Sequence, residues 1–410
     1  MDANNYPPIG KYKIKTTIGG FVMIKKSRVY LNFIITVAFI LVNMPILVNS
    51  DTELSLNCKS ALLMEASTGE IIYEMNAHDK LEPASVTKIM TMLLAMEALE
   101  NGRITLEDKV TISRKASKMT GTCLLLEEGE VRTVNDLLIG IAVESANDAS
   151  VALAEHIAGS EEEFVRMMNE KAQELGMADT TFKNCHGLHE EGHVSSAHDI
   201  AVMSRELIKH EKIFDYISIY MTKVTVGKKN NVVRELANKN KMVRFYDDVD
   251  GIKTGYTEKA MYCISATAKR NNLRFISVIM GAPSTGSRNN DARKLLDYGF
   301  ANYSTYAVGK KGDVIKTLEV LKGNKYRVNA VIENDANVLI KKGEEKLIEK
   351  KIVIPDKISA PLSKGDKLGE IVIIKNGKTL QSIPVVAQED VSKASFFNNI
   401  YKAIRYWLGE

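Results

Sequence analysis

A serine and a lysine three residues apart offer a nucleophile and a base within one small volume. Ser85 and Lys88 lie in residues 83–90, and positions i and i+3 of a helix share a face. A serine hydroxyl becomes a good nucleophile when a neighbouring group accepts its proton, and a desolvated, neutral lysine can accept it. Residues 89–99 are apolar nearly all round, so we expect a buried helix here. The lysine at its head therefore needs polar partners from elsewhere in the chain.

Two further short motifs supply such partners. Ser145-Ala146-Asn147 follows a predicted helix that Thr133 would cap, and Lys253-Thr254-Gly255 lies in a short strand with glycine on both sides. Each motif is common by itself. The three motifs together, in this order and in these contexts, are typical of penicillin-binding proteins and serine β-lactamases.

The chemistry of acyl transfer explains this set of residues. Ser85 would be the acyl-accepting nucleophile and Lys88 its base, because burial and a second cation at Lys253 both lower the pKa of a lysine. Ser145 would relay a proton to the leaving amine, and Asn147 would hold Lys88 and a substrate amide. The sequence therefore predicts a serine mechanism with a neutral lysine as base.

The strand that contains the third motif would bind the substrate. Lys253 and Thr254 provide a cation and a hydroxyl for the terminal carboxylate, and Gly255 lets the strand approach the substrate closely. The backbone N–H groups of Ser85 and Tyr256 would form the oxyanion hole.

Residues 52–300 resemble the low-molecular-weight D-alanyl-D-alanine carboxypeptidases. Arg288 stands where that family has an arginine that helps to bind the substrate carboxylate. Cys185 departs from the family, which usually has proline before this x-Gly-Leu turn. The resemblance rests on these stretches: residues 61–65 with the hairpin after them, 83–88, 144–149, 186–188, 250–255 and 281–296.

The resemblance implies a reaction. Ser85 would attack the carbonyl of the penultimate D-alanine of a peptidoglycan stem pentapeptide, the terminal D-alanine would leave, and water would hydrolyse the acyl-enzyme. β-Lactam antibiotics would acylate the same serine, and neither a metal nor another cofactor is expected.

The order of predicted elements indicates the fold class. Strands, then helices, then strands and a last helix over residues 291–303 predict an α/β domain of the β-lactamase/transpeptidase-like type, with helices packed on an antiparallel sheet and a helical subdomain. This serine D,D-peptidase domain would span residues 51–305. Short alternating strands broken by glycine turns predict a small all-β domain over residues 306–387.

The N-terminal segment indicates export. Residues 1–50 contain a basic stretch, an apolar run and small residues at Val48 and Ser50, which predicts a secretory signal peptide cleaved near Ser50, with Met23 as an alternative start. An uncleaved anchor over residues 29–48 is the competing interpretation. We expect the mature enzyme at the outer face of the cytoplasmic membrane or in the cell wall space.

The last segment, residues 388–410, predicts an amphipathic helix. Its apolar and aromatic face suits a membrane interface, and docking on the preceding β domain is the alternative. The residues of this face are Phe397, Ile400, Tyr401, Ile404 and Leu408.

Composition narrows the remaining classes of function. A formal net charge of +4 with scattered lysines gives no basic face of the kind that nucleic-acid binders show, so no nucleic acid partner is expected. The 4 cysteines are far apart and form no Cys-x-x-Cys pair, and we expect free thiols.

Three competing activities remain. His189-Glu190-Glu191-Gly192-His193 matches the H-E-x-x-H pattern of zinc metallopeptidases, but glycines interrupt the segment and a loop is expected. A β-lactamase of the class A type would need a deacylating glutamate where Val165 stands before Asn169. A D,D-transpeptidase would differ only in its acceptor.

Overall fold

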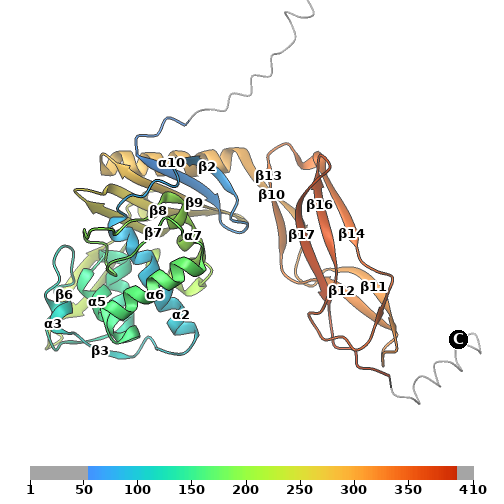
Figure 1. Cartoon of the computed structure of the whole chain (residues 1–410), viewed down its shortest axis with the longest axis horizontal. Coiled ribbons are helices and arrows are strands. Elements are labelled where there is room, and N and C mark those ends of the chain that lie inside the picture. The colour runs from blue at the N-terminus through green and yellow to red at the C-terminus, as the bar shows by residue number, and fades with distance from the viewer. Residues whose placement is uncertain (1–53, 395–410) are drawn as a thin grey trace, which may run out of the picture. The chain divides into compact units, whose positions relative to one another are not determined.

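The computed structural model describes residues 54–394, and its first part is an α/β domain built on a five-stranded antiparallel sheet (Figure 1). Strand β1 pairs with β9, so the first hairpin and the last strands of the domain join in one sheet and β7 lies at its edge. The strand order is β2-β1-β9-β8-β7, with β1 Ser60–Glu65, β2 Ile71–Met75, β7 Val249–Thr257, β8 Met261–Arg270 and β9 Leu273–Ala282.

Alternate side chains of the sheet enter two different cores. In β1, Ala61 and Leu63 pack in a core with helix α10 (Thr285–Asn302), whereas Leu62 and Met64 pack in a larger core with the other helices. Because both faces are covered, β8 and β9 are apolar along most of their length. The predicted fold class is confirmed: helices pack on an antiparallel sheet.

The chain between β2 and β7 forms the helical subdomain and two small hairpins. Thr133 caps helix α4 through the N–H of Asp136, as predicted, and Ser196 caps helix α7 through the N–H of Asp199. The elements are η1 Ala84–Thr87, α2 Lys88–Glu100, β3 Lys109–Thr111, α3 Arg114–Ser117, β4 Val131–Thr133, α4 Val134–Ile139, η2 Gly140–Glu144, α5 Asn147–Ala158, α6 Glu161–Glu174, α7 Ala197–Leu207, η3 Glu211–Ile213, α8 Phe214–Ile217, β5 Met221–Val226, β6 Val232–Ala237 and α9 Met242–Phe245.

Helix α10 begins at Thr285, six residues before the helix predicted over 291–303. The side chain of Ser284 accepts a hydrogen bond from the N–H of Ser287 and starts the helix there. Arg288 therefore lies inside the first turns of a long helix. The β5–β6 hairpin was not predicted either.

The second part is all β, as predicted. Its apolar side chains form a core of their own, and Leu339 packs in the α10 core of the first part. The six-stranded sheet has the order β14-β16-β17-β12-β11-β15, and β10 pairs with β13; the bounds are β10 Tyr303–Gly309, β11 Val314–Leu321, β12 Arg327–Ile332, β13 Ala336–Lys341, η4 Glu345–Leu347, β14 Ile348–Val353, β15 Lys357–Ser359, β16 Lys367–Lys375 and β17 Lys378–Ala387.

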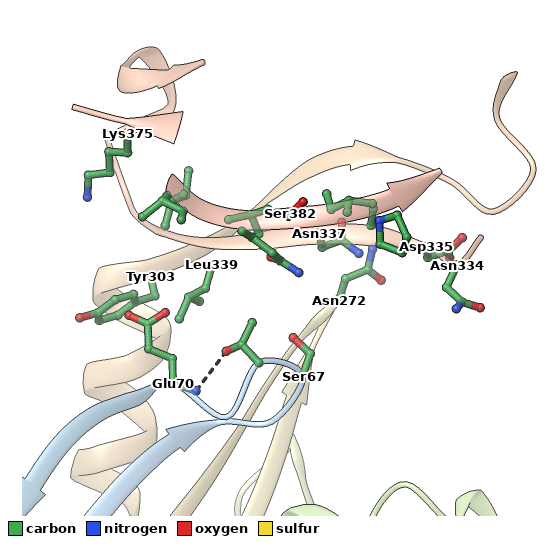
Figure 2. Close-up of a pocket in the computed structure, with 18 of the residues that line it drawn as sticks. Ser67, Glu70, Asn272, Tyr303, Asn334, Asp335, Asn337, Leu339, Lys375 and Ser382 are labelled. Carbon is green, nitrogen blue, oxygen red and sulfur yellow. Dashed lines mark hydrogen bonds between the residues drawn. The ribbon is translucent and has the colours of Figure 1, made fainter. Parts of the chain in front are cut away.

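A polar cavity of about 730 Å³ lies beside the turn after β1 (Figure 2). Ser67 and Glu70 line it together with Asn272, and Asn337 and Ser382 line it from strands of the all-β part. None of the predicted site residues lines this cavity.

The predicted terminal helix is wrong at its start. Residues 388–394 are not helical. They begin with a bend, and then Val391, which is buried in the β core, pairs with Leu362, and Lys393 pairs with Gly323. Residues 395–410 of that predicted helix, and the predicted signal segment 1–50, lie outside the described residues. No helix among residues 54–394 has the length and apolar character needed to cross a membrane.

Candidate active site

The Ser85–Lys88 pair spans the junction between a short 3-10 turn and helix α2. Ser85 lies in the turn η1, and Lys88 is the first residue of α2. The distance between Lys88 Nζ and Ser85 Oγ is 3.1 Å. Ser85 stays partly exposed, whereas Lys88 is fully buried. The i, i+3 spacing therefore places the buried amine of Lys88 within hydrogen-bond distance of the partly exposed hydroxyl of Ser85.

Two oxygens complete the surroundings of the Lys88 amine. Lys88 Nζ donates to Asn147 Oδ1 over 2.7 Å and to the carbonyl oxygen of His186 over 2.6 Å. Burial lowers the pKa of Lys88 to about 7, against a smaller opposing effect of neighbours that include Cys185 and Asp148. We expected the charge of Lys253 to lower the pKa of Lys88 as well. The repulsion between the two amines instead affects Lys253, whose pKa is lowered well below its usual range by burial and then by the charge of Lys88.

Ser145 and Asn147 follow a local distortion of the helix. The π-helical turn η2 ends at Ser145, which has a left-handed backbone with φ of 70°. Ser145 Oγ is buried and has no hydrogen-bond partner among the described residues. Asn147 is fixed through its Nδ2, which donates to Thr120 O over 2.7 Å. A strained backbone and an unpaired buried hydroxyl are both features that concentrate at functional sites.

The turn at residues 184–188 packs against the residues around Lys88 and supplies the His186 carbonyl that the Lys88 amine contacts. An added Cβ on Gly187 would lie 1.9 Å from Ala84 O, so only glycine fits there. Thr91 Oγ1 donates to Cys185 O over 2.6 Å, and Cys185 Sγ lies 3.3 Å from the Glu161 carboxylate. The cysteine that departs from the family pattern is therefore built into the turn, and burial raises the pKa of its thiol.

Strand β7 approaches the nucleophile at Gly255. An added Cβ on Gly255 would lie 2.9 Å from Pro83 O and 3.0 Å from Ser85 N, so the glycine lets β7 approach the backbone beside the nucleophile. The close approach of this strand to a substrate stays a prediction. Thr254 is buried, and the Tyr256 side chain is 53% exposed, with its ring 4.4 Å from that of Tyr262. Tyr256 follows Gly255 in the strand, so its backbone lies in the part of β7 that approaches Ser85.

Arg288 and Lys253 form a pair of buried cations without an acidic partner. Neither makes an ion pair with any described carboxylate, and Arg288 is only 4% exposed. Burial lowers the pKa of Arg288 to about 10, and the charge of Arg288 contributes to the lowered pKa of Lys253. Two buried basic side chains without an acidic partner suit an anionic group of a substrate.

The H-E-x-x-H segment forms a loop and not a helix, as expected. His193 is buried, its Nδ1 accepts from the N–H of Lys183, and its Nε2 lies 2.8 Å from Thr87 Oγ1. His189 lies at the surface, 2.9 Å from a carboxylate oxygen of Glu82. His193 therefore supports the turn beside Ser85, with both ring nitrogens occupied by protein groups.

Sequence reasoning missed three groups that hold the site. The His186 carbonyl contacts Lys88, the His193 ring holds Thr87, and Asn289 accepts from the Arg288 guanidinium. The 186–188 turn carried a signal as part of the family resemblance, but a backbone carbonyl has no signature in sequence.

Comparison with known proteins identifies the family. The model for the family described as D-alanyl-D-alanine carboxypeptidase matches residues 47–284, and that of the penicillin-binding protein 5 C-terminal domain matches residues 303–393. The chain belongs to the D-alanyl-D-alanine carboxypeptidase family. The predicted resemblance and the predicted enzyme class, a serine-type D-alanyl-D-alanine carboxypeptidase, are thereby confirmed.

The individual relatives cover between 60% and 87% of this chain. The D-alanyl-D-alanine carboxypeptidase DacF of Bacillus subtilis is 44% identical over 359 residues, which are 87% of this chain and 91% of the relative. The structure of penicillin binding protein 5 from Haemophilus influenzae is 32% identical with a TM-score of 0.70, and the match covers 83% of this chain and 98% of that one. Penicillin-binding protein D2 of Listeria monocytogenes, in its ampicillin-bound form, is 31% identical with a TM-score of 0.54 over 60% of this chain and 99% of that one.

Proposed function

We propose that Ser85 is the nucleophile that removes the terminal D-alanine from peptidoglycan stem pentapeptides. The 3.1 Å distance between Lys88 Nζ and Ser85 Oγ carries this proposal, because the amine is fully buried. A neutral amine has two N–H bonds and one lone pair. Asn147 Oδ1 and the His186 carbonyl accept the two N–H bonds, so the lone pair remains for the Ser85 O–H.

Acylation exchanges one bond and moves one proton. Ser85 Oγ attacks the carbonyl carbon of the penultimate D-alanine while its proton passes to Lys88 Nζ. The backbone N–H groups of Ser85 and Tyr256 stabilise the resulting oxyanion. The C–N bond then breaks, and the proton returns from Lys88 to the nitrogen of the departing D-alanine. Ser145 Oγ makes no hydrogen bond to Lys88 among the described residues, so it would join this path once the substrate is bound.

Deacylation repeats the proton path with water. A water molecule attacks the acyl carbonyl and gives a proton to Lys88, which returns it to Ser85 Oγ as the ester bond breaks. Lys253, Thr254 and Arg288 hold the terminal carboxylate during the first half of the reaction, because Lys253 and Arg288 are buried cations without an acidic partner.

β-Lactams would acylate Ser85 and leave it slowly. The ampicillin-bound form of the Listeria D2 relative supports the binding of a β-lactam to Ser85. Slow release of the β-lactam is expected from helix α6, where Val165 stands in the place of the deacylating glutamate of class A enzymes. The Asn169 side chain is hydrogen-bonded to the backbone of Val165 and Phe182. A D,D-transpeptidase activity would require an amine acceptor in place of water.

We also propose that the enzyme works outside the cytoplasmic membrane. A predicted signal segment at 1–50 supports this location, as do relatives named D-alanyl-D-alanine carboxypeptidases, because the proposed stem-peptide substrate lies in the cell wall. Residues 395–410 would lie in the membrane interface. Cell fractionation of the full chain and of a chain truncated after residue 394 tests this, and equal release of both forms would contradict the membrane contact.

Mass spectrometry after exposure to penicillin tests the mechanism. We expect one covalent adduct, on the peptide that contains Ser85, and neither adduct nor D-alanine release in Ser85→Ala. Release of D-alanine by Ser85→Ala would refute the proposed nucleophile.

A further inference from the structure

The Arg288 guanidinium is held by the residue next to it in the chain. Arg288 Nε and Nη2 donate to the same atom, Asn289 Oδ1, over 3.0 Å and 2.9 Å. Among the described residues, Asn289 is the only side chain to which Arg288 donates. Both residues lie in the first turns of helix α10.

This contact fixes the plane of the guanidinium. A guanidinium is a rigid fork with five N–H donors, and an acceptor shared by Nε and one terminal nitrogen sets the direction of the opposite edge. The Nη1 donors and the second donor of Nη2 are then left for another group. Because the amide of Asn289 is neutral, it orients Arg288 without neutralising its charge.

The surroundings of Arg288 indicate what that other group is. The guanidinium is nearly completely buried, no described carboxylate forms an ion pair with it, and Lys253 is a second unpaired cation nearby. An acidic residue at position 289 would supply the missing anion from the protein itself. The neutral asparagine leaves that place open for the substrate.

We propose that Asn289 is a positioning residue that aims Arg288 at the carboxylate of the terminal D-alanine and preserves its charge for that contact. The inference rests on the proposed function, in which Arg288 binds this carboxylate. It predicts that substrates without a terminal carboxylate are insensitive to Asn289.

Asn289→Asp separates positioning from a merely structural role. Aspartate has the same size and would bind Arg288 more strongly, so the fold should be at least as stable, yet its charge competes with the substrate carboxylate. Asn289→Ala removes the contact, and neither change adds volume to a side chain that is only partly buried. Asn290→Asp is the matched control. Asn290 is exposed, and this substitution adds the same negative charge one residue further along α10.

The experiment compares two substrates of the full-length enzyme. The first is a soluble acyl-D-alanyl-D-alanine peptide, and the second is an N-acyl-D-alanine thioester whose leaving thiol is uncharged. For the peptide, KM should rise roughly tenfold to a hundredfold in Asn289→Asp and Asn289→Ala, which is the loss expected for a charge-assisted hydrogen bond, with kcat within threefold of the wild type. For the thioester, kcat/KM should stay within twofold, and Asn290→Asp should match the wild type on both substrates.

Two results would overturn the inference. In the first, Asn289→Asp keeps the wild-type KM for the peptide. In the second, Asn289→Asp and Asn289→Ala slow peptide and thioester equally, which is the effect of a structural role. The release of D-alanine by the wild type tests the proposed function separately, because the inference is read only from the ratio of variant to wild type.

Discussion

Replacement of Lys88 by arginine keeps a positive charge at the head of α2 but removes the base. Burial lowers the pKa of Lys88 from the ordinary 10.5 to about 7. At pH 7 about half of the Lys88 side chains are then neutral, compared with roughly one in three thousand for an ordinary lysine. Arginine stays charged at every working pH. Because a positioned general base contributes about 10²- to 10⁴-fold, Lys88→Arg should slow acylation by a factor in that range.

Stopped-flow acylation by a fluorescent penicillin between pH 5 and 9 measures this effect. The wild-type rate should rise about tenfold per pH unit below 7 and level off above it, since only the neutral amine accepts the Ser85 proton. The rate of Lys88→Arg should be low and nearly independent of pH. Lys80→Arg, at a lysine whose side chain is 58% exposed, is the control and should behave like the wild type.

The reasoning would be refuted by either of two outcomes. Acylation of Lys88→Arg within threefold of the wild-type rate would mean that no proton is transferred to Lys88. A wild-type rate that stays constant from pH 5 to 9 would mean that Lys88 does not titrate in this range.

Three further predictions concern residues around the pair. Ser145→Ala should lower kcat for D-alanine release at least tenfold without lowering the melting temperature, because the buried Ser145 Oγ has no partner to lose among the described residues; unchanged kcat would exclude the proton relay. Gly187→Ala should lower the free energy of unfolding in urea by about 2 kcal/mol or more, since its Cβ would lie 1.9 Å from Ala84 O. The control Gly192→Ala, whose Cβ would meet only a lysine side chain at 3.3 Å, should lower it by about 1 kcal/mol. Equal losses in the two variants would contradict the steric argument. Burial lowers the pKa of His193 from 6.5 to about 4, so its contribution to stability is complete above pH 6.5 and is lost as the pH falls through 4. This amounts to about 3 kcal/mol of unfolding free energy, and His193→Gln should lack that part of the pH dependence; identical pH profiles would refute the assignment.

The pattern of the sequence predicted the chemistry better than the geometry around it. The structure brings together the three side chains whose motifs predict it, Ser85, Lys88 and Asn147. The i, i+3 spacing fixes the first two, and the amide of Asn147 is an evident partner for a buried lysine. The His186 carbonyl could not be predicted, since every residue carries a carbonyl and only the fold selects one. The role of Asn289 depends in the same way on the rotamer of its neighbour.

The fold was predictable where periodicity is strong and local. The buried helix α2 and the strands β8 and β9 follow directly from their apolar patterns. The pairing of β1 with β9 was not predictable, because it joins segments at opposite ends of the domain. Residues 388–394 were predicted as helix, but the burial of Val391 in the β core overrides the helical pattern.

The central claim is that Lys88 has a pKa near 7, so that a large fraction of its amine is neutral at working pH. Lysine labelled with ¹³C at Cε reports the ionisation of each amine by NMR, and the Lys88 signal can be assigned by its absence from the spectrum of Lys88→Arg. We predict a titration midpoint near 7, the value to which burial lowers the pKa of Lys88. A Lys88 signal that stays in the ammonium position up to pH 9 would contradict the account.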